Sequence, residues 1–171
     1  MSALTSRRTE DSADDLKALY QELILDHGKS PRNLRPVEHP TCTAKGNNPM
    51  CGDKVTVSAR VSEAGVIEDI AFEGRGCAIS IASASMMTLA LKGRTVDGAR
   101  RLFAAVQGLC TGRMELTTAK AETPVEMSDA LDELAALSGV RQFPVRVKCA
   151  TLPWHALVSC LDGSATATTE S

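Results

Sequence analysis

The chain has 171 residues, of which 43% are hydrophobic and only 3% aromatic, and its formal net charge at pH 7 is −2. This length suits a single domain with a sizeable core, and the apolar content is too high for a disordered chain. No basic block stands out, so the charge pattern gives nucleic-acid binding no support.

The sequence predicts neither a secretory signal at the N-terminus nor a transmembrane helix. Residues 1–13 are polar and lack the apolar core of a secretory signal, and no window reaches about 18 consecutive apolar residues. We therefore expect a cytoplasmic protein without a membrane span. Because that compartment is reducing, we expect the six cysteines to be free or metal-bound rather than joined in disulfides.

The N-terminal half is expected to hold one helix and a small sheet. Leucines recur at helical spacing over residues 14–27, and Gly28 suits the position just after a helix. Residues 55–61 alternate between apolar and polar side chains, which predicts a half-buried strand. A returning strand is expected over 66–73, and residues 41–46 add a third antiparallel strand.

The C-terminal half is expected to be helical. Residues 78–91 predict a buried helix, and Thr95 is placed to cap the next one. Ser128 is expected to cap a short helix that stops near Gly139, and the last helix is expected to begin near Cys149. A helix, an antiparallel meander and then more helices indicate an α+β fold, in which a three-stranded sheet is packed by helices.

The chain divides into three parts by composition. Residues 1–13 form a polar N-terminal arm, residues 14–163 a single domain, and residues 164–171, rich in Ser, Thr and Ala, a loose tail. Within the domain, residues 108–127 lack clear periodicity, which marks the stretch over 108–139 as the least regular part.

Three cysteines lie in settings that favour metal binding. Cys51 is followed by a glycine and Asp53, Cys77 follows two glycines, and Cys149 follows a basic stretch. The dipole at a helix N-terminus favours a thiolate, and we expect Cys77 and Cys149 to lie at helix starts. Three thiolates and a carboxylate suit tetrahedral Zn²⁺, but thiolates also hold iron–sulfur clusters, so ligand type leaves the metal open.

Each of these residues also has a simpler interpretation. A buried cysteine is commonly a small hydrophobic residue, and we expect that role for the remaining three, Cys42, Cys110 and Cys160. Asp53 could instead stabilise its loop as an Asx turn. Arg146 and Lys148 could be solvated charges on a strand face, or could offset the charge of a thiolate cluster. His27 ends the first helix, where a cation is favourable.

Several segments together resemble the IscU/SufU/NifU-N family of iron–sulfur cluster assembly proteins. The resemblance covers about residues 14–161, and its motifs keep the family order. They comprise the end of the first helix, the loop around Cys51, the glycines and small residues around Cys77, and the stretch before Cys149, at residues 26–33, 48–53, 74–87 and 146–150.

Two departures make the chain most similar to the SufU type. Lys148 stands where IscU-type scaffolds carry a histidine, and the segment over 108–139 lengthens the separation between Cys77 and Cys149, as in a SufU-type insertion. SufU-type members resemble IscU in fold, but typically bind Zn²⁺ and accept sulfur from a SufS-type cysteine desulfurase.

The resemblance implies a role for each site residue. Cys51, Asp53, Cys77 and Cys149 match the zinc ligands, Cys51 also matches the sulfur acceptor, and Arg146 matches an arginine implicated in desulfurase activation. The implied protein is a zinc-dependent sulfurtransferase that serves the desulfurase and the downstream SUF machinery rather than a stand-alone enzyme. We expect a monomer or a weak oligomer.

Two other functions remain open at this point. An IscU-type scaffold would use the same ligands to assemble and transfer a 2Fe–2S cluster instead of holding Zn²⁺. A zinc-stabilised interaction module would keep the metal for folding alone, with no sulfur chemistry.

Overall fold

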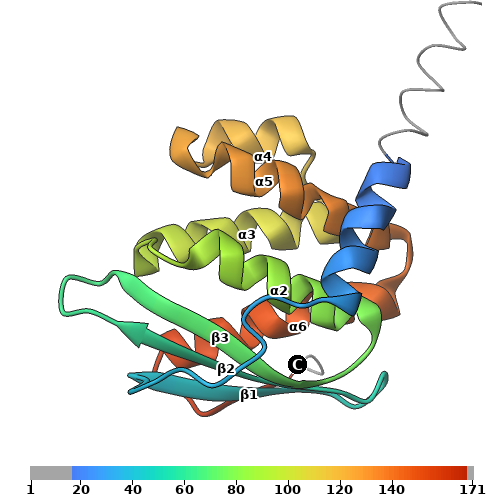
Figure 1. The fold of residues 1–171 in the computed structure, drawn as a ribbon. Helices are drawn as coiled ribbons and strands as arrows, with labels where there is room; N and C mark the ends of the chain where they lie inside the picture. Colours follow the sequence, from blue (N-terminus) through green and yellow to red (C-terminus); the bar gives the residue numbers. More distant parts are fainter. Residues whose placement is uncertain (1–16, 169–171) are drawn as a thin grey trace, which may run out of the picture.

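A computed structural model of the protein describes residues 17–168, so the polar arm predicted for residues 1–13 lies outside the described residues. An antiparallel sheet forms one layer, and helices cover one of its faces (Figure 1). The predicted α+β class with three antiparallel strands is confirmed. Within residues 17–168, no helix is long and apolar enough to span a membrane.

The sheet comprises β1 (Cys42–Asn48), β2 (Asp53–Val61), β3 (Ile67–Arg75) and a short β4 (Thr166–Thr168), in the order β3-β2-β1-β4. Alternate residues of β2 point into the core, with Val55, Val57 and Ala59 buried, as the alternation predicted. Val57 pairs with Ala44 of β1 and Phe72 of β3, which are also buried.

The fourth strand corrects the expected tail. Residues 164–171 were expected to be loose, but β4 pairs in parallel with β1 over Lys45–Asn47. The Lys45 N–H also donates to the Ala165 carbonyl at 2.9 Å. The segment after α6 therefore turns back and pairs with the free edge of β1.

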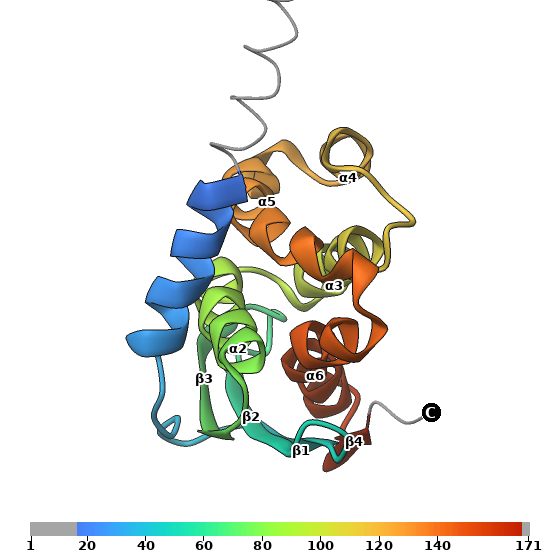
Figure 2. The ribbon, with the colours of Figure 1, turned by 90° about the vertical axis from the view of Figure 1, so that its right-hand side faces the viewer.

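The helices form two layers over the sheet, with α2 and α6 next to the strands and α3 to α5 farther out (Figure 2). The Thr95 hydroxyl accepts the Gly98 N–H, so the predicted cap of α3 is confirmed. The helical segments are the N-terminal helix (17–29), α2 (Ala78–Leu91), α3 (Val96–Thr111), α4 (Leu116–Glu122), α5 (Ser128–Leu134) and α6 (Pro144–Leu161), with 3-10 turns at Val125–Met127 and Ala135–Gln142.

Three helix boundaries differ from those expected. The N-terminal helix continues through Gly28 to residue 29. Ser128 is the first residue of α5 rather than its cap, and no side-chain capping bond forms there. The last helix begins at Pro144, five residues before Cys149, because proline is well suited to the first turn of a helix. Arg146 and Lys148 therefore lie on a helix and not on a strand.

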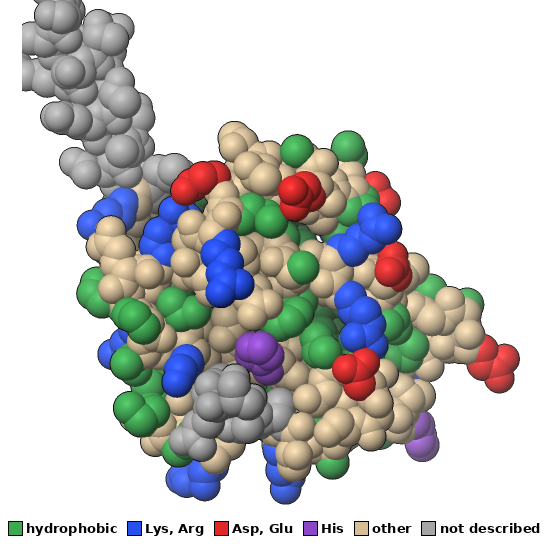
Figure 3. Space-filling model, turned by 180° about the vertical axis from the view of Figure 1, so that it is seen from behind, with side chains coloured by type: hydrophobic (Ala, Val, Ile, Leu, Met, Phe, Trp, Pro, Cys, Tyr) green, Lys and Arg blue, Asp and Glu red, His purple; other side chains and the backbone are tan. Residues whose placement is uncertain are grey.

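The irregular stretch over 108–139 extends the helical layer. α4 and α5 follow the end of α3 and pack on its far side from the sheet (Figure 1). Ala119, Leu131 and Leu134 are buried among them and join the main hydrophobic core. On the face shown in Figure 3, basic and acidic side chains are interspersed over these helices and the sheet edge.

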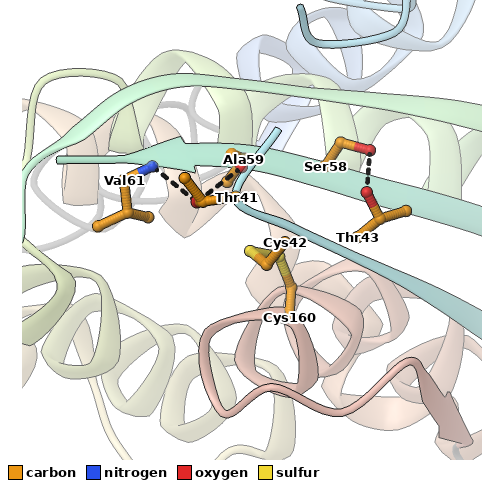
Figure 4. The surroundings of a disulfide bond; sticks show 7 residues. All are labelled: Thr41, Cys42, Thr43, Ser58, Ala59, Val61 and Cys160. Atoms are coloured by element: carbon orange, nitrogen blue, oxygen red, sulfur yellow. Dashed lines mark hydrogen bonds between the residues drawn. A yellow bond between two sulfur atoms is a disulfide. The ribbon is translucent and has the colours of Figure 1, made fainter. Parts of the chain in front are cut away.

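A disulfide corrects the expectation that all cysteines are unpaired. Cys42 and Cys160 are bonded, with their Cα atoms 5.2 Å apart, where the start of β1 faces the last turn of α6 (Figure 4). Neither is therefore the free core thiol that the sequence suggested. Cys110 fits that description, because it is buried and burial raises the pKa of its thiol to about 12.

Candidate metal centre

Residues from three separate segments converge at one end of the strands, where β1 and β3 finish and β2 begins. Cys51 lies in the turn between β1 and β2, Cys77 at the junction of β3 and α2, and Cys149 in α6. One ligand atom each from Cys51, Asp53 and Cys149 lie within 4.8 Å of one another. The Cys77 sulfur lies 4.0 Å from Asp53 Oδ2, beside this group. The four residues singled out from the sequence thus come together.

Asp53 joins the site to the backbone of the next segment. It is fully buried at the start of β2, and its Oδ1 accepts the Cys77 N–H at 2.8 Å. Its carboxylate is therefore held by a residue far along the chain rather than by an Asx turn. Gly76 makes this approach possible, because a Cβ there would lie 2.6 Å from Asp53 Oδ1.

The three cysteines lie in different backbone settings. Cys77 is the N-cap of α2, so its expected position at a helix start is confirmed. Cys149 lies in the second turn of α6 and is fully buried, so the helix-start argument is wrong for it. Cys51 lies between Met50, which is 70% exposed, and Gly52, whose φ of 70° marks a tight turn.

Burial affects the protonation of the thiols at the site. Burial, followed by hydrogen bonds with Asp53 and Cys51, raises the pKa of the Cys149 thiol. A metal ion would reverse this effect, because a coordinated thiol is deprotonated. The sulfurs of Cys77 and Cys149 raise the pKa of the Arg146 guanidinium, which is exposed in the first turn of α6. Arg146 therefore lies within the electrostatic field of the cluster.

Asn48 is a site residue to which the sequence argument assigned no role. It is fully buried at the end of β1, with its Nδ2 3.4 Å from Asp53 Oδ2 and 3.6 Å from the Cys149 sulfur. Its Oδ1 is buried and has no hydrogen-bond partner among the described residues. Its place in the motif before Cys51 was visible, but its contact with Cys149 depends on the fold.

No histidine reaches the cluster in the part of the chain that the structure describes. His27 is buried, and its Nδ1 lies 2.7 Å from the Ser85 hydroxyl. Burial lowers the pKa of its ring, which disfavours the helix-end cation that was expected. His155 packs edge-on against Phe103, and His39 lies in a loop. Among the described residues, the candidate ligand atoms at the site are therefore sulfur and oxygen.

This donor set fits a tetrahedral metal ion. The Cys51 and Cys149 sulfurs are 3.2 Å apart. Two sulfurs bound to Zn²⁺ at about 2.3 Å lie about 3.8 Å from each other, so a small movement would accommodate the ion. The unpartnered Asn48 Oδ1 leaves one buried acceptor for a water or another outer-sphere contact. Thiolates and a carboxylate fit Zn²⁺, and thiolates also suit iron–sulfur clusters.

Comparison with known proteins agrees with the fold and the motifs. The model of the NifU-like N-terminal domain matches residues 19–150. The chain is 39% identical over 145 residues to the zinc-dependent sulfurtransferase SufU of Bacillus subtilis, covering 84% of this chain and 89% of that protein. It is 37% identical over 152 residues to the iron–sulfur cluster assembly scaffold protein IscU of Streptococcus pyogenes, covering 89% and 88%.

A solved structure supports the same grouping. A protein from Fervidobacterium islandicum AW-1, assigned as an iron–sulfur cluster assembly scaffold for the SUF system, superposes with a TM-score of 0.69 at 28% identity. The match covers 82% of this chain and 94% of that one.

Proposed function

This chain belongs to the NifU-like N-terminal domain family, whose members serve iron–sulfur cluster assembly, and we propose that it acts there as a zinc-dependent sulfur acceptor. It takes sulfur from a SufS-type cysteine desulfurase in the cytoplasm and passes it to the downstream SUF machinery. The observation that carries this proposal is the contrast within the cluster, where half-buried Cys51 lies against fully buried Cys149 and no histidine of the described residues joins them.

Cys51, Asp53, Cys77 and Cys149 would hold the metal. Bound Zn²⁺ would keep the thiols deprotonated and protect them from oxidation. Asp53 is fixed by the Cys77 N–H, and Cys149 by its helix, so these residues form the rigid side of the site. Cys51 lies on the glycine turn and is the residue best able to move outward.

Cys51 is the proposed nucleophile. Its thiolate attacks the terminal sulfur of a persulfide on the desulfurase cysteine, and a new S–S bond forms on Cys51. The old S–S bond breaks, and the desulfurase cysteine leaves as a thiolate. The oxidation state of the transferred sulfur does not change, so the step needs no oxidant or reductant. Arg146 is exposed at the rim, where its charge can steer an anionic group toward the cluster.

The runner-up is a cluster scaffold that uses the same ligands. The similarity to the IscU of Streptococcus pyogenes keeps this alternative in view. A donor set without histidine favours the zinc protein, because Lys148 stands where IscU-type scaffolds carry a histidine, next to Cys149. Metal analysis after anaerobic purification separates the two, since a scaffold would hold iron with visible absorption and no zinc.

The direct test is transfer of labelled sulfur. Zinc-loaded protein is incubated with a SufS-type desulfurase and ³⁵S-cysteine or unlabelled cysteine, and peptides are analysed by mass spectrometry. We expect a gain of about 32 Da on the peptide of Cys51, one sulfur atom, and none on that of Cys110. Cys51→Ser should abolish the gain, whereas Cys110→Ser should retain it. Normal desulfurase turnover without a persulfide on Cys51 would contradict the proposal.

A further inference from the structure

The disulfide lies at the far end of the two elements that carry the metal centre. Cys42 is the first residue of β1, and β1 ends at Asn48 beside the cluster. Cys160 lies in the last turn of α6, which carries Cys149 near its other end. At about 3.3 Å per residue, the strand separates the two places by about 20 Å.

The strand and the helix are packed closely between these ends. Gly46 lies at the middle of β1, and a Cβ there would be 3.0 Å from Leu152 Cδ1 and 3.2 Å from the Ala156 Cβ. Leu152 and Ala156 are fully buried on α6. β1 and α6 are therefore in contact at the Asn48–Cys149 end, at Gly46 and at the disulfide.

The chain after the disulfide adds a second attachment. It reverses at Gly163 and returns as β4, which pairs with β1 over only three residues. Cys160 precedes this reversal, so the disulfide closes a ring through β1, β4 and the end of α6. With so short a strand, the covalent bond is the strongest attachment of this end of α6 to β1.

We propose that Cys42 and Cys160 are a reversible redox site, which clamps α6 to β1 when oxidised and loosens the metal centre when reduced. Disulfides of chains kept in reducing compartments are usually transient or redox-sensing. Neither cysteine belongs to the cluster, so their oxidation state can change while Cys51, Cys77 and Cys149 stay available.

The partner chemistry is that of a dithiol reductant. One of its thiolates attacks Cys42, which is half-buried, whereas Cys160 is only 2% exposed. The Cys42–Cys160 bond breaks, Cys160 leaves as a thiolate and takes up a proton, and a mixed disulfide with Cys42 remains. The second thiol of the reductant then displaces Cys42. Two electrons and two protons pass to the protein, and the reductant ends as a disulfide.

The first experiment establishes the pair and its reversibility. Zinc-loaded protein is denatured without reductant and alkylated, and the blocked thiols are counted by mass spectrometry. We expect four in the oxidised chain, matching the four free cysteines, and six after brief treatment of the folded protein with a dithiol. Six in the oxidised chain would overturn the pair, and a bond that is reduced only after unfolding would overturn its reversibility.

The second experiment tests the coupling to the metal centre. Hydrogen exchange is followed in oxidised and reduced protein after the reductant has been removed, and zinc release to a chromogenic chelator is timed in the same samples. Reduction should speed exchange over 42–48 and 165–168, and should speed zinc release by about tenfold, the lower end of effects seen when outer support of a metal site is lost.

Matched variants separate coupling from general weakening. Cys42→Ser should behave like reduced protein in both measurements and should not respond to reductant, whereas Cys110→Ser should respond as the unmodified chain does. Equal hydrogen exchange and equal zinc release in the two redox states would overturn the clamp.

Discussion

The two ends of the β1–α6 pair hold cysteines in contrasting surroundings. At one end, Cys51 and Cys149 lie with the buried side chains of Asp53 and Asn48. At the other end, Cys42 and Cys160 adjoin the hydrophobic core and are bonded to each other (Figure 4). Cysteine is thus a candidate metal ligand at one end and a disulfide partner at the other, and the neighbouring groups decide which role it takes.

The contrast has a physical origin. A buried carboxylate and an unpartnered amide oxygen are costly without a cation or a further partner, so they favour metal coordination by the thiols nearby. Two thiols that face each other across apolar packing have no such partner, and oxidation removes both from titration. Substitutions or reduction that affect the metal centre, the disulfide, both or neither can therefore test whether the two cysteine sites have separate roles.

The largest effect should come from opening the disulfide. It joins residues 118 positions apart, so it removes much of the entropy of the unfolded chain. We expect reduction to lower the free energy of unfolding by about 2–5 kcal/mol. Urea titration of metal-free oxidised and reduced protein measures this. A double variant, Cys42→Ala with Cys160→Ala, should match the reduced chain, and equal midpoints in the two redox states would contradict the prediction.

A change at the middle of β1 should act on both ends. Gly46→Ala places a Cβ against Leu152 and Ala156, neither of which has room to withdraw because both are fully buried. Overpacking of this kind costs about 1–3 kcal/mol of stability. We also expect weaker zinc binding, measured by chelator competition. Gly139→Ala is the control, since nothing lies within 4 Å of its Cβ position, and equal losses in both variants would refute a specific β1–α6 contact.

A change beside Asp53 should act on the metal end alone. Gly76→Ala would push a Cβ to 2.6 Å from Asp53 Oδ1 and displace the carboxylate. We expect zinc affinity to fall by about 10- to 100-fold, as when supporting contacts of a ligand are lost. The Cys42–Cys160 bond should form as before, as counted by thiol alkylation. Unchanged affinity would show that Asp53 contributes little to metal binding.

Local patterns predicted the sheet and most of the helices. The alternation over 55–61 and the small residues after Cys77 carry their own structural preference, and the strand β2 and the helix α2 lie where these patterns indicated. The motif glycines and Asp53 also suggested a site before any fold was known. Such features can be predicted because the deciding residues are neighbours in the sequence.

The predictions that were wrong concern features decided by residues far apart in the sequence. Residues 145–148 alternate apolar and basic side chains, as a strand does, but burial of the following residues of α6 makes them a helix. β4 is a short polar strand that forms because β1 has a free edge. The disulfide and the Asn48–Cys149 contact join residues about a hundred positions apart. Each depends on tertiary packing that no local pattern carries.

The smallest expected effect is a pH dependence of stability that comes from His27 and involves neither pair of cysteines. Burial, with a further contribution from Arg32, lowers the pKa of His27, whose Nδ1 lies 2.7 Å from the Ser85 hydroxyl. The unfolded chain therefore takes up a proton first as pH falls below 6.5, and the free energy of unfolding decreases until the pH passes the folded pKa. Each unit of pKa lowering is worth about 1.4 kcal/mol.

The same pH dependence should appear in oxidised and reduced protein, because His27 belongs to neither cysteine group. Urea titrations of metal-free protein between pH 5 and 7 measure it. Burial also lowers the pKa of His155, so His27→Gln should reduce the slope without abolishing it. A redox-dependent difference in slope that persisted in His27→Gln would come from His155 on α6. A difference that disappeared in His27→Gln would mean that the disulfide reaches as far as the N-terminal helix. The clamp would then hold the whole helical layer, and not only α6 against β1.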